Sequence, residues 1–244
     1  MRLLAIDTCL RAGGVAALQD GTLLKAVFSK TEEPYSSRLF RDLRTLAEST
    51  RLAIGDYDAY AVANGPGSFT GVRAGVTAAK AWSEVFGKPV VEISSLEAVA
   101  AQIVYSDATV KGLPALQSRE LICAVLDAHR GQVFGGIYRS FNGGQIERLF
   151  EGALSPGDLI AEVLARAENS SVRFATPTAD MLSAALVGSK LEGSAVITAS
   201  EDLAPWVGRI AVERLKAGKS RDALTLDANY IRRCDAEVYW KGTA

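Results

Sequence analysis

Residues 64–73 read Asn-Gly-Pro-Gly-Ser-Phe-Thr-Gly-Val-Arg, and they form the most distinctive segment of the chain. The three glycines and the proline predict a loop at 65–71, between a buried strand at 58–64 and a helix at 72–86. The N–H groups at the start of that helix favour a bound anion. The alternative is a tight connection that packs against its own neighbours.

This loop differs from the known motifs with similar composition. It is not a Walker A loop, because no Gly-Lys-Ser/Thr follows, and it is not a nucleophile elbow, because Pro66 and Thr70 stand where that motif has glycines around Ser68. It matches the dinucleotide fingerprint only as Gly-x-Gly-x-x-x-Gly, and three strands precede it where the fingerprint follows the first strand.

The pattern on both sides of the loop indicates an α/β chain with a duplicated topology. Three antiparallel strands followed by helix, strand and helix are predicted twice. The two copies show no visible sequence repeat. The predicted domains are 1–105 and 106–218, joined at 107–118, with 219–244 packing on the first. The predicted strands are 3–7, 14–18, 22–28, 58–64, 89–93, 121–127, 132–139, 145–150, 172–175, 195–198 and, as a strand or extended segment, 229–232. Three predicted helices of the first half start at Ser36 or Ser37, at Val72 and at Ser94 or Ser95. Three further helices are predicted at 156–167, 180–186 and 201–217, and a turn is predicted at 142–144.

Two helices of the first half carry regular apolar or small faces. Leu39, Leu43 and Leu46 repeat at helical spacing on one, and Gly71, Gly75, Ala79 and Ser83 recur every four residues on the other. These faces pack either on the chain's own sheet or against helices of another subunit.

Composition excludes several classes of protein. A chain of 244 residues with net charge −1 has no general attraction to nucleic acid, and a single histidine, His129, excludes a zinc or iron site built from several histidines. Cys9, Cys123 and Cys234 are too far apart for a zinc ribbon or a thioredoxin motif, and they suggest a reducing compartment. The longest uncharged stretch, 59–72, is shorter than a membrane span, so we expect a cytoplasmic protein with no membrane contact.

The run at 65–73 and the opening 4–8 closely resemble the TsaB (YeaZ) family, and 126–134 and 229–232 are similar to two further family segments. The resemblance implies an actin-like ATPase-superfamily fold of two ribonuclease-H-like (βββαβα) lobes, as in actin, Hsp70 and sugar kinases. It implies a non-catalytic partner subunit in the synthesis of N6-threonylcarbamoyladenosine at position 37 of tRNA. The partners implied are the catalytic, metal-binding TsaD and the ATPase TsaE, with a homodimer when the chain is alone and tRNA bound only through the complex. Members often carry His-Ser before the first helix, where this chain has Tyr35-Ser36.

Two sets of candidate residues follow, and neither includes a catalytic or metal-ligating group. The partner interface is predicted at Leu39, Phe40, Leu43, Leu46, Val72, Arg73, Gly75, Val76, Ala79 and Lys80. A nucleotide phosphate is predicted, if one binds, at Asp7, Thr8, Gly67, Ser68 and Thr70, with ATP or ADP at a subunit junction and no other cofactor.

The rival prediction is an ATP-hydrolysing or phosphotransfer enzyme of the same superfamily. Asp7 and Asp127 end the first strand of each lobe, where the related fold places magnesium and phosphate contacts in its kinases. A hydrolase would have to use His129, which the sequence places beside a turn.

Overall fold

The computed structural model describes residues 1–28, 33, 35–105, 116–117, 119–141 and 145–232, and it omits the side chains of residues 35 and 36. The predicted turn at 142–144 and most of the predicted join at 107–118 lie outside the described residues, as does Cys234.

Two five-stranded sheets of the same design form the frame of the molecule. In each sheet three antiparallel strands continue into two parallel ones, in the orders β3-β2-β1-β4-β5 and β8-β7-β6-β9-β10. The predicted duplication of topology is therefore confirmed. The strands are β1 (Arg2–Asp7), β2 (Gly14–Gln19), β3 (Thr22–Phe28), β4 (Ala59–Ala63), β5 (Val90–Ile93), β6 (Leu121–Asp127), β7 (Val133–Phe141), β8 (Gln145–Leu154), β9 (Val172–Thr176) and β10 (Ala195–Thr198).

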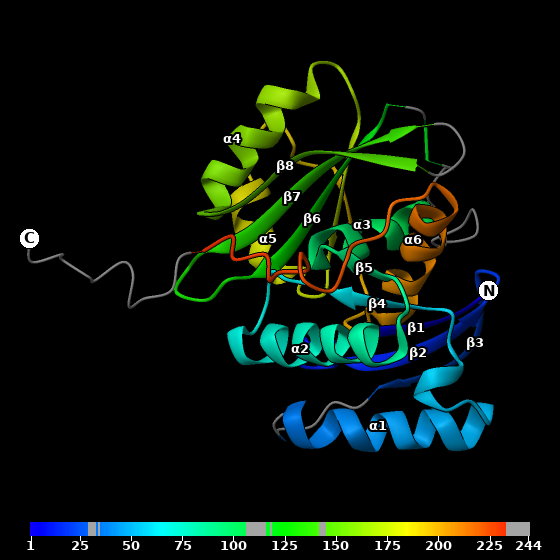
Figure 1. The fold of residues 1–244 in the computed structure, drawn as a ribbon. Helices are drawn as coiled ribbons and strands as arrows, with labels where there is room; N and C mark the ends of the chain where they lie inside the picture. Colours follow the sequence, from blue (N-terminus) through cyan, green and yellow to red (C-terminus); the bar gives the residue numbers. More distant parts are fainter. Residues whose placement is uncertain (29–32, 34, 106–115, 118, 142–144, 233–244) are drawn as a thin grey trace, which may run out of the picture.

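Helices cover the outer face of each sheet and fill the space between the sheets (Figure 1). The helices are α1 (Tyr35–Thr50), η1 (Ile54–Asp56), α2 (Phe69–Phe86), α3 (Ser95–Tyr105), α4 (Pro156–Ala167), α5 (Asp180–Leu186) and α6 (Ala204–Lys216). α1 and α2 pack on the first sheet, and α4 contacts β7 of the second. None of the described helices is both long and apolar enough to cross a membrane.

The two central helices are exchanged between the halves of the fold. α3, which follows the first sheet in sequence, packs on β6 and β7 of the second, whereas α6, the last helix, packs on β1 and β2 of the first. Hydrophobic periodicity identifies the buried face of a helix but not the sheet that covers it. The predicted domain limits stay a prediction, and the packing of α6 crosses them.

Two local predictions are wrong. α2 begins at Phe69 and not at Val72, because the Ser68 hydroxyl caps the helix by accepting a hydrogen bond from the Gly71 N–H (3.4 Å). The predicted loop therefore loses its last three residues to the first turn of the helix. Of the two alternatives predicted for 229–232, the strand is wrong, since the backbone there pairs with loop residues and not with a sheet edge.

Candidate functional site

The glycine loop packs directly against the end of β1. A Cβ atom at Gly67 would lie within 3.0 Å of three atoms of Cys9, and the Ser68 N–H donates to the Cys9 carbonyl oxygen (2.9 Å). The Thr8 hydroxyl donates to the Gly71 carbonyl oxygen (2.6 Å). A Cβ at Gly75, one turn further along α2, would also overlap the Thr8 hydroxyl oxygen. The glycines thus allow α2 and its loop to approach β1 closely, as the internal-packing alternative states.

The residues predicted to hold a phosphate meet at this contact, but their polar groups are largely engaged within the chain. The backbone N–H groups of Ser68, Gly71 and Val72 all have internal acceptors, so the folded loop leaves none of these three donors for a phosphate. Thr8 is buried, whereas Thr70 is exposed. Phosphate binding at this loop stays a prediction.

Asp7 has a buried polar atom that no other described group satisfies. Its Oδ1 accepts a hydrogen bond from the Cys9 N–H (2.8 Å), and its buried Oδ2 has no partner among the described residues. Burial raises the pKa of Asp7 from 3.8 to about 7. A carboxyl group in this environment is costly to ionise.

Most of the predicted partner interface lies in the chain's own core. Seven members of the set, all apolar or small, are buried where α1 packs on β2 and β3 and α2 packs on β4. Of the set, Phe40 and Arg73 are exposed and Lys80 is half-buried. The buried members are Leu39, Leu43, Leu46, Val72, Gly75, Val76 and Ala79. The internal-packing alternative accounts for these seven residues, and a role in binding another subunit stays a prediction.

An exposed group of three side chains, which we call the aromatic–arginine cluster, joins two distant segments. The Arg73 Cζ lies 3.8 Å from the centre of the Phe69 ring, and the Arg73 Nε donates to the Tyr230 hydroxyl (2.8 Å). The two rings are 5.3 Å apart, and Phe69 and Tyr230 are 44% and 46% exposed. The cluster therefore connects the glycine-loop segment with the motif at 229–232. Of these three residues only Arg73 was among the predicted site residues, although both segments stand out in the sequence.

The C-terminal segment 217–232 runs from the edge of the first sheet to the second half of the fold. Arg221 forms an antiparallel bridge with Val90, and the Asn229 N–H donates to the Asn64 carbonyl oxygen (2.7 Å). The Arg232 guanidinium then donates to the Ala128 carbonyl oxygen (2.7 Å), just beyond β6. This segment links the two halves.

The chain's histidine lies at the surface. His129 is 81% exposed at the side chain, and its Nδ1 lies 3.3 Å from an oxygen of Asp127. Across the described ranges, no group of three or more His, Cys, Asp or Glu side chains is arranged to hold a metal ion. Burial raises the pKa of the Cys9 and Cys123 thiols, so neither is an activated nucleophile.

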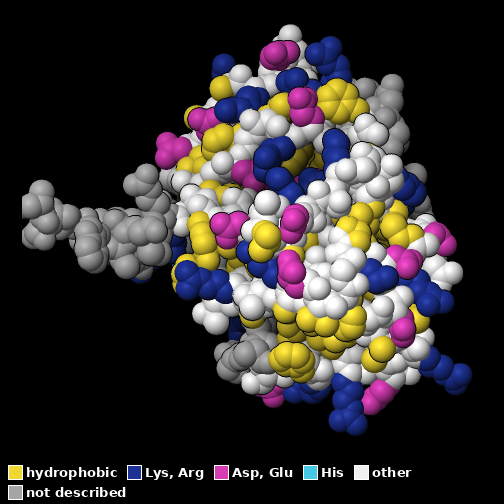
Figure 2. All heavy atoms as spheres, viewed as in Figure 1, with side chains coloured by type: hydrophobic (Ala, Val, Ile, Leu, Met, Phe, Trp, Pro, Cys, Tyr) yellow, Lys and Arg dark blue, Asp and Glu magenta, His cyan; other side chains and the backbone are white. Residues whose placement is uncertain are grey.

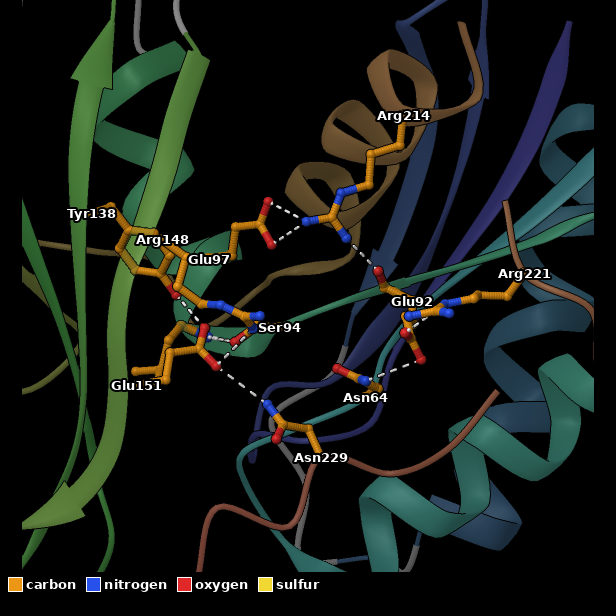
Figure 3. Close-up of polar contacts among 11 residues, drawn as sticks. Asn64, Glu92, Ser94, Glu97, Tyr138, Arg148, Glu151, Arg214, Arg221 and Asn229 are labelled. Atoms are coloured by element: carbon orange, nitrogen blue, oxygen red, sulfur yellow. Dashed lines mark hydrogen bonds and ion pairs between the residues drawn. The ribbon is translucent and has the colours of Figure 1, made fainter. Parts of the chain in front are cut away.

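A polar cleft lies between the two halves (Figure 3). Glu97 of α3 accepts both of its bonds from Arg214 of α6 (2.6 and 2.7 Å), and Arg214 also donates to the Glu92 carbonyl oxygen (2.6 Å). From the second sheet, the Tyr138 hydroxyl donates to Glu151 (2.5 Å). None of these residues was predicted as functional, because each bond joins residues far apart in the sequence or depends on a strand register.

A family model described as TsaD, tRNA N6-adenosine threonylcarbamoyltransferase, matches residues 29–229. The chain is 35% identical over 143 residues to the tRNA threonylcarbamoyladenosine biosynthesis protein TsaB of Bacillus subtilis, an alignment that covers 59% of this chain and 57% of that protein. It is 27% identical to the TsaB of Escherichia coli, over 99% of this chain and 97% of that protein.

Solved structures share the fold. YeaZ from Pseudomonas aeruginosa superposes with a TM-score of 0.75 at 21% identity, over 94% of this chain and 99% of that one. The ROK hexokinase of Thermus thermophilus superposes with a TM-score of 0.52 at 14% identity, over 89% of this chain and 100% of that one. The predicted fold class, two ribonuclease-H-like lobes of the actin and sugar-kinase type, is confirmed. The chain belongs to the TsaD-type family of the actin-like ATPase superfamily, and within it to the TsaB (YeaZ) proteins.

Proposed function

We propose that this chain acts in tRNA threonylcarbamoyladenosine biosynthesis as a non-catalytic subunit that binds the catalytic, metal-binding TsaD and supports threonylcarbamoyl transfer. The names of the B. subtilis and E. coli relatives support the pathway. The observation that carries the role of a binding subunit is the exposed aromatic–arginine cluster of Phe69, Arg73 and Tyr230.

The cluster has the chemistry of a protein-binding surface. Aromatic and arginine side chains dominate the residues on which protein–protein affinity depends, whereas lysine and glutamate are depleted there. The Phe69 ring and the Tyr230 hydroxyl hold the Arg73 guanidinium in place, so little side-chain entropy would be lost on binding. Phe69 and Tyr230 are each nearly half exposed and so are accessible to a partner.

Further hydrophobic side chains gather over α2 in Figure 2, which is viewed as Figure 1 is. Val85 and Phe86, at the C-terminal end of α2, are exposed, and so is Phe40 of α1, a helix that contacts α2. A surface that extends from the cluster over α2 and α1 would provide the area that a stable heterodimer needs.

The catalytic step is assigned to the partner for a chemical reason. The resemblance implies that TsaD binds its metal with a pair of histidines, and a chain with one histidine has no such pair. In the same proposal, the TsaE ATPase and the tRNA are reached through the complex, the isolated chain forms a homodimer, and the complex works in the cytoplasm.

The test is to measure binding of this chain to the TsaD of the same organism by gel filtration with light scattering and by calorimetry. Arg73→Ala and Tyr230→Ala should each weaken the complex by about tenfold or more. Lys190→Ala, an exposed substitution in the second half, is the matched control and should leave the affinity unchanged.

Two outcomes would overturn the proposal at different levels. If the parent chain forms no complex with TsaD, the role of partner subunit is wrong. If a complex forms and both cluster variants bind as tightly as the parent, the assigned surface is wrong.

A further inference from the structure

The polar cleft between the two halves has the size of a small-molecule site. Its volume is about 500 Å³, within the range of about 300–1,000 Å³ in which proteins hold small ligands. Its walls come from the ends of β4 and β5, from α3, β7, β8 and α6, and from the C-terminal segment. None of the residues predicted to bind a phosphate or a partner lines it.

The carboxylates on the first-half side of the cleft already have cationic partners. Both carboxylate oxygens of Glu97 accept from Arg214 Nη2, and the Glu92 carbonyl oxygen accepts from Arg214 Nη1. The Glu92 carboxylate accepts from Arg221 Nε (3.0 Å). Arg214 thus makes three hydrogen bonds within the chain, whereas Arg221 makes one, through its Nε.

On the second-half side, the Glu151 side chain does not line the cleft itself but is almost fully buried and similarly engaged. It accepts from the Tyr138 hydroxyl (2.5 Å) and from the Asn229 side-chain amide (3.3 Å). Arg148 of β8 approaches it to 3.6 Å, which is an ion pair without a close hydrogen bond.

Two arginine forks thus retain unused donors on opposite sides of the cleft. The Arg148 and Arg221 side chains are 62% and 57% exposed, and within the part of the chain that the structure describes neither guanidinium has a hydrogen bond or ion pair beyond the one given above. Both guanidinium groups point into the space between the halves (Figure 3). Figure 2 shows Lys and Arg side chains gathered in the hollow above α2.

The rest of the lining limits the ligand to a small, hydrophilic molecule with little net charge. Ile146 and Ala228 are the aliphatic side chains of the lining, and the Tyr138 ring is fully buried, so neither an acyl chain nor a nucleobase would find a surface to pack on. Glu92, Glu97 and Asp227 also line the cleft and would repel a phosphate dianion. A single planar carboxylate matches the arginine forks and, with one negative charge, meets less of this repulsion.

We propose that the cleft binds a small polar ligand that carries one carboxylate, an amino acid or a hydroxy acid, with the carboxylate held between Arg148 and Arg221. The site is independent of the aromatic–arginine cluster, and it does not depend on the proposed function.

The test is calorimetric titration of the full chain, at low ionic strength, with L-serine, with glycerate and with inorganic phosphate. Serine and glycerate differ only in the ammonium group that replaces a hydroxyl, so they separate an amino acid from a hydroxy acid. We expect one of these two to bind and phosphate to bind more weakly. Arg148→Gln and Arg221→Gln should each raise the Kd by about tenfold or more, because each removes a charge-assisted hydrogen bond. Arg148→Lys should bind with intermediate affinity, because it keeps the charge but loses the planar fork.

Arg44→Gln is the matched control, since Arg44 is an exposed arginine of α1 that is also paired with a glutamate, Glu48 (2.9 Å). It should leave the Kd unchanged, and equal unfolding temperatures of the variants would exclude misfolding. The proposal is overturned if neither serine nor glycerate binds, if phosphate binds more tightly than both, or if both Gln variants bind like the parent.

Discussion

Gly67→Ala tests whether the glycine loop is built for internal packing. Gly67 is not at a positive φ, so alanine introduces no backbone strain, and the whole effect comes from the added methyl group. That methyl would lie within 3.0 Å of the carbonyl oxygen, carbonyl carbon and Cβ of Cys9. These are backbone or near-backbone atoms at the end of β1, so they cannot rotate away as the tip of a flexible side chain does.

The expected cost has two parts. Overpacking a tight contact costs about 1–3 kcal/mol. The displacement also lengthens the hydrogen bond from the Ser68 N–H to the Cys9 carbonyl oxygen (2.9 Å), which is worth about 1 kcal/mol. A total of about 3 kcal/mol lowers the unfolding temperature of a chain of this size by about 6–12 °C.

The assay is thermal unfolding followed by circular dichroism, with Gly157→Ala as the control. Gly157 lies in the first turn of α4, and its Cβ would meet nothing closer than the Ser155 hydroxyl oxygen at 3.9 Å. Alanine there should be neutral or slightly stabilising. If Gly67→Ala unfolds at the same temperature as the parent, the loop is not packed as described, and a cradle open to a ligand becomes the better account.

Three further predictions concern the carboxyl groups and the C-terminal segment. The pKa of Asp7 is raised from 3.8 to about 7 by burial, so the folded state binds this proton more tightly and Asp7 stabilises the fold only while protonated. Between about pH 4 and pH 7 the parent should therefore lose roughly 4 kcal/mol of stability relative to Asp7→Asn, measured by urea unfolding, and parallel pH profiles would contradict this. Arg214→Met leaves the Glu97 carboxylate without its cationic partner and should lower the free energy of unfolding by about 3 kcal/mol. In the background of Glu97→Gln the same substitution should lower it by much less. Equal losses in the two backgrounds would show that the pair is not coupled. Tyr230→Phe removes only the hydroxyl that accepts from Arg73 at a half-exposed site, so it should cost under about 1 kcal/mol in thermal unfolding, and a loss of several kcal/mol would mean that the hydroxyl has another structural role.

Local patterns were sufficient to predict the strands and their duplicated order. Alternating and continuous apolar runs, Gly turns and Ser caps report backbone geometry within a few residues, and Ser155 before Pro156 indeed caps α4. The start of α2 was missed, because Gly71 and Thr70 have low helix propensity and only the Ser68 cap reveals that they are helical.

Long-range pairings could not be predicted in the same way. The periodicity of Leu39, Leu43 and Leu46 shows that one face of α1 is buried, but nothing in the spacing states whether the covering surface belongs to the same chain or to a partner. Tyr230 lies 157 residues from Arg73, so only the fold brings the two family motifs together. For the same reason the cleft was not anticipated.

The most direct test of the proposed function is to measure N6-threonylcarbamoyladenosine formation on tRNA by a reconstituted system that contains TsaD and TsaE, with and without this chain. We predict that the modified adenosine forms only when the chain is present, that the chain without TsaD forms none, and that the folded variant Arg73→Ala/Tyr230→Ala restores much less product than Lys190→Ala. Equal formation of the modified adenosine with and without the chain would contradict the role of partner subunit.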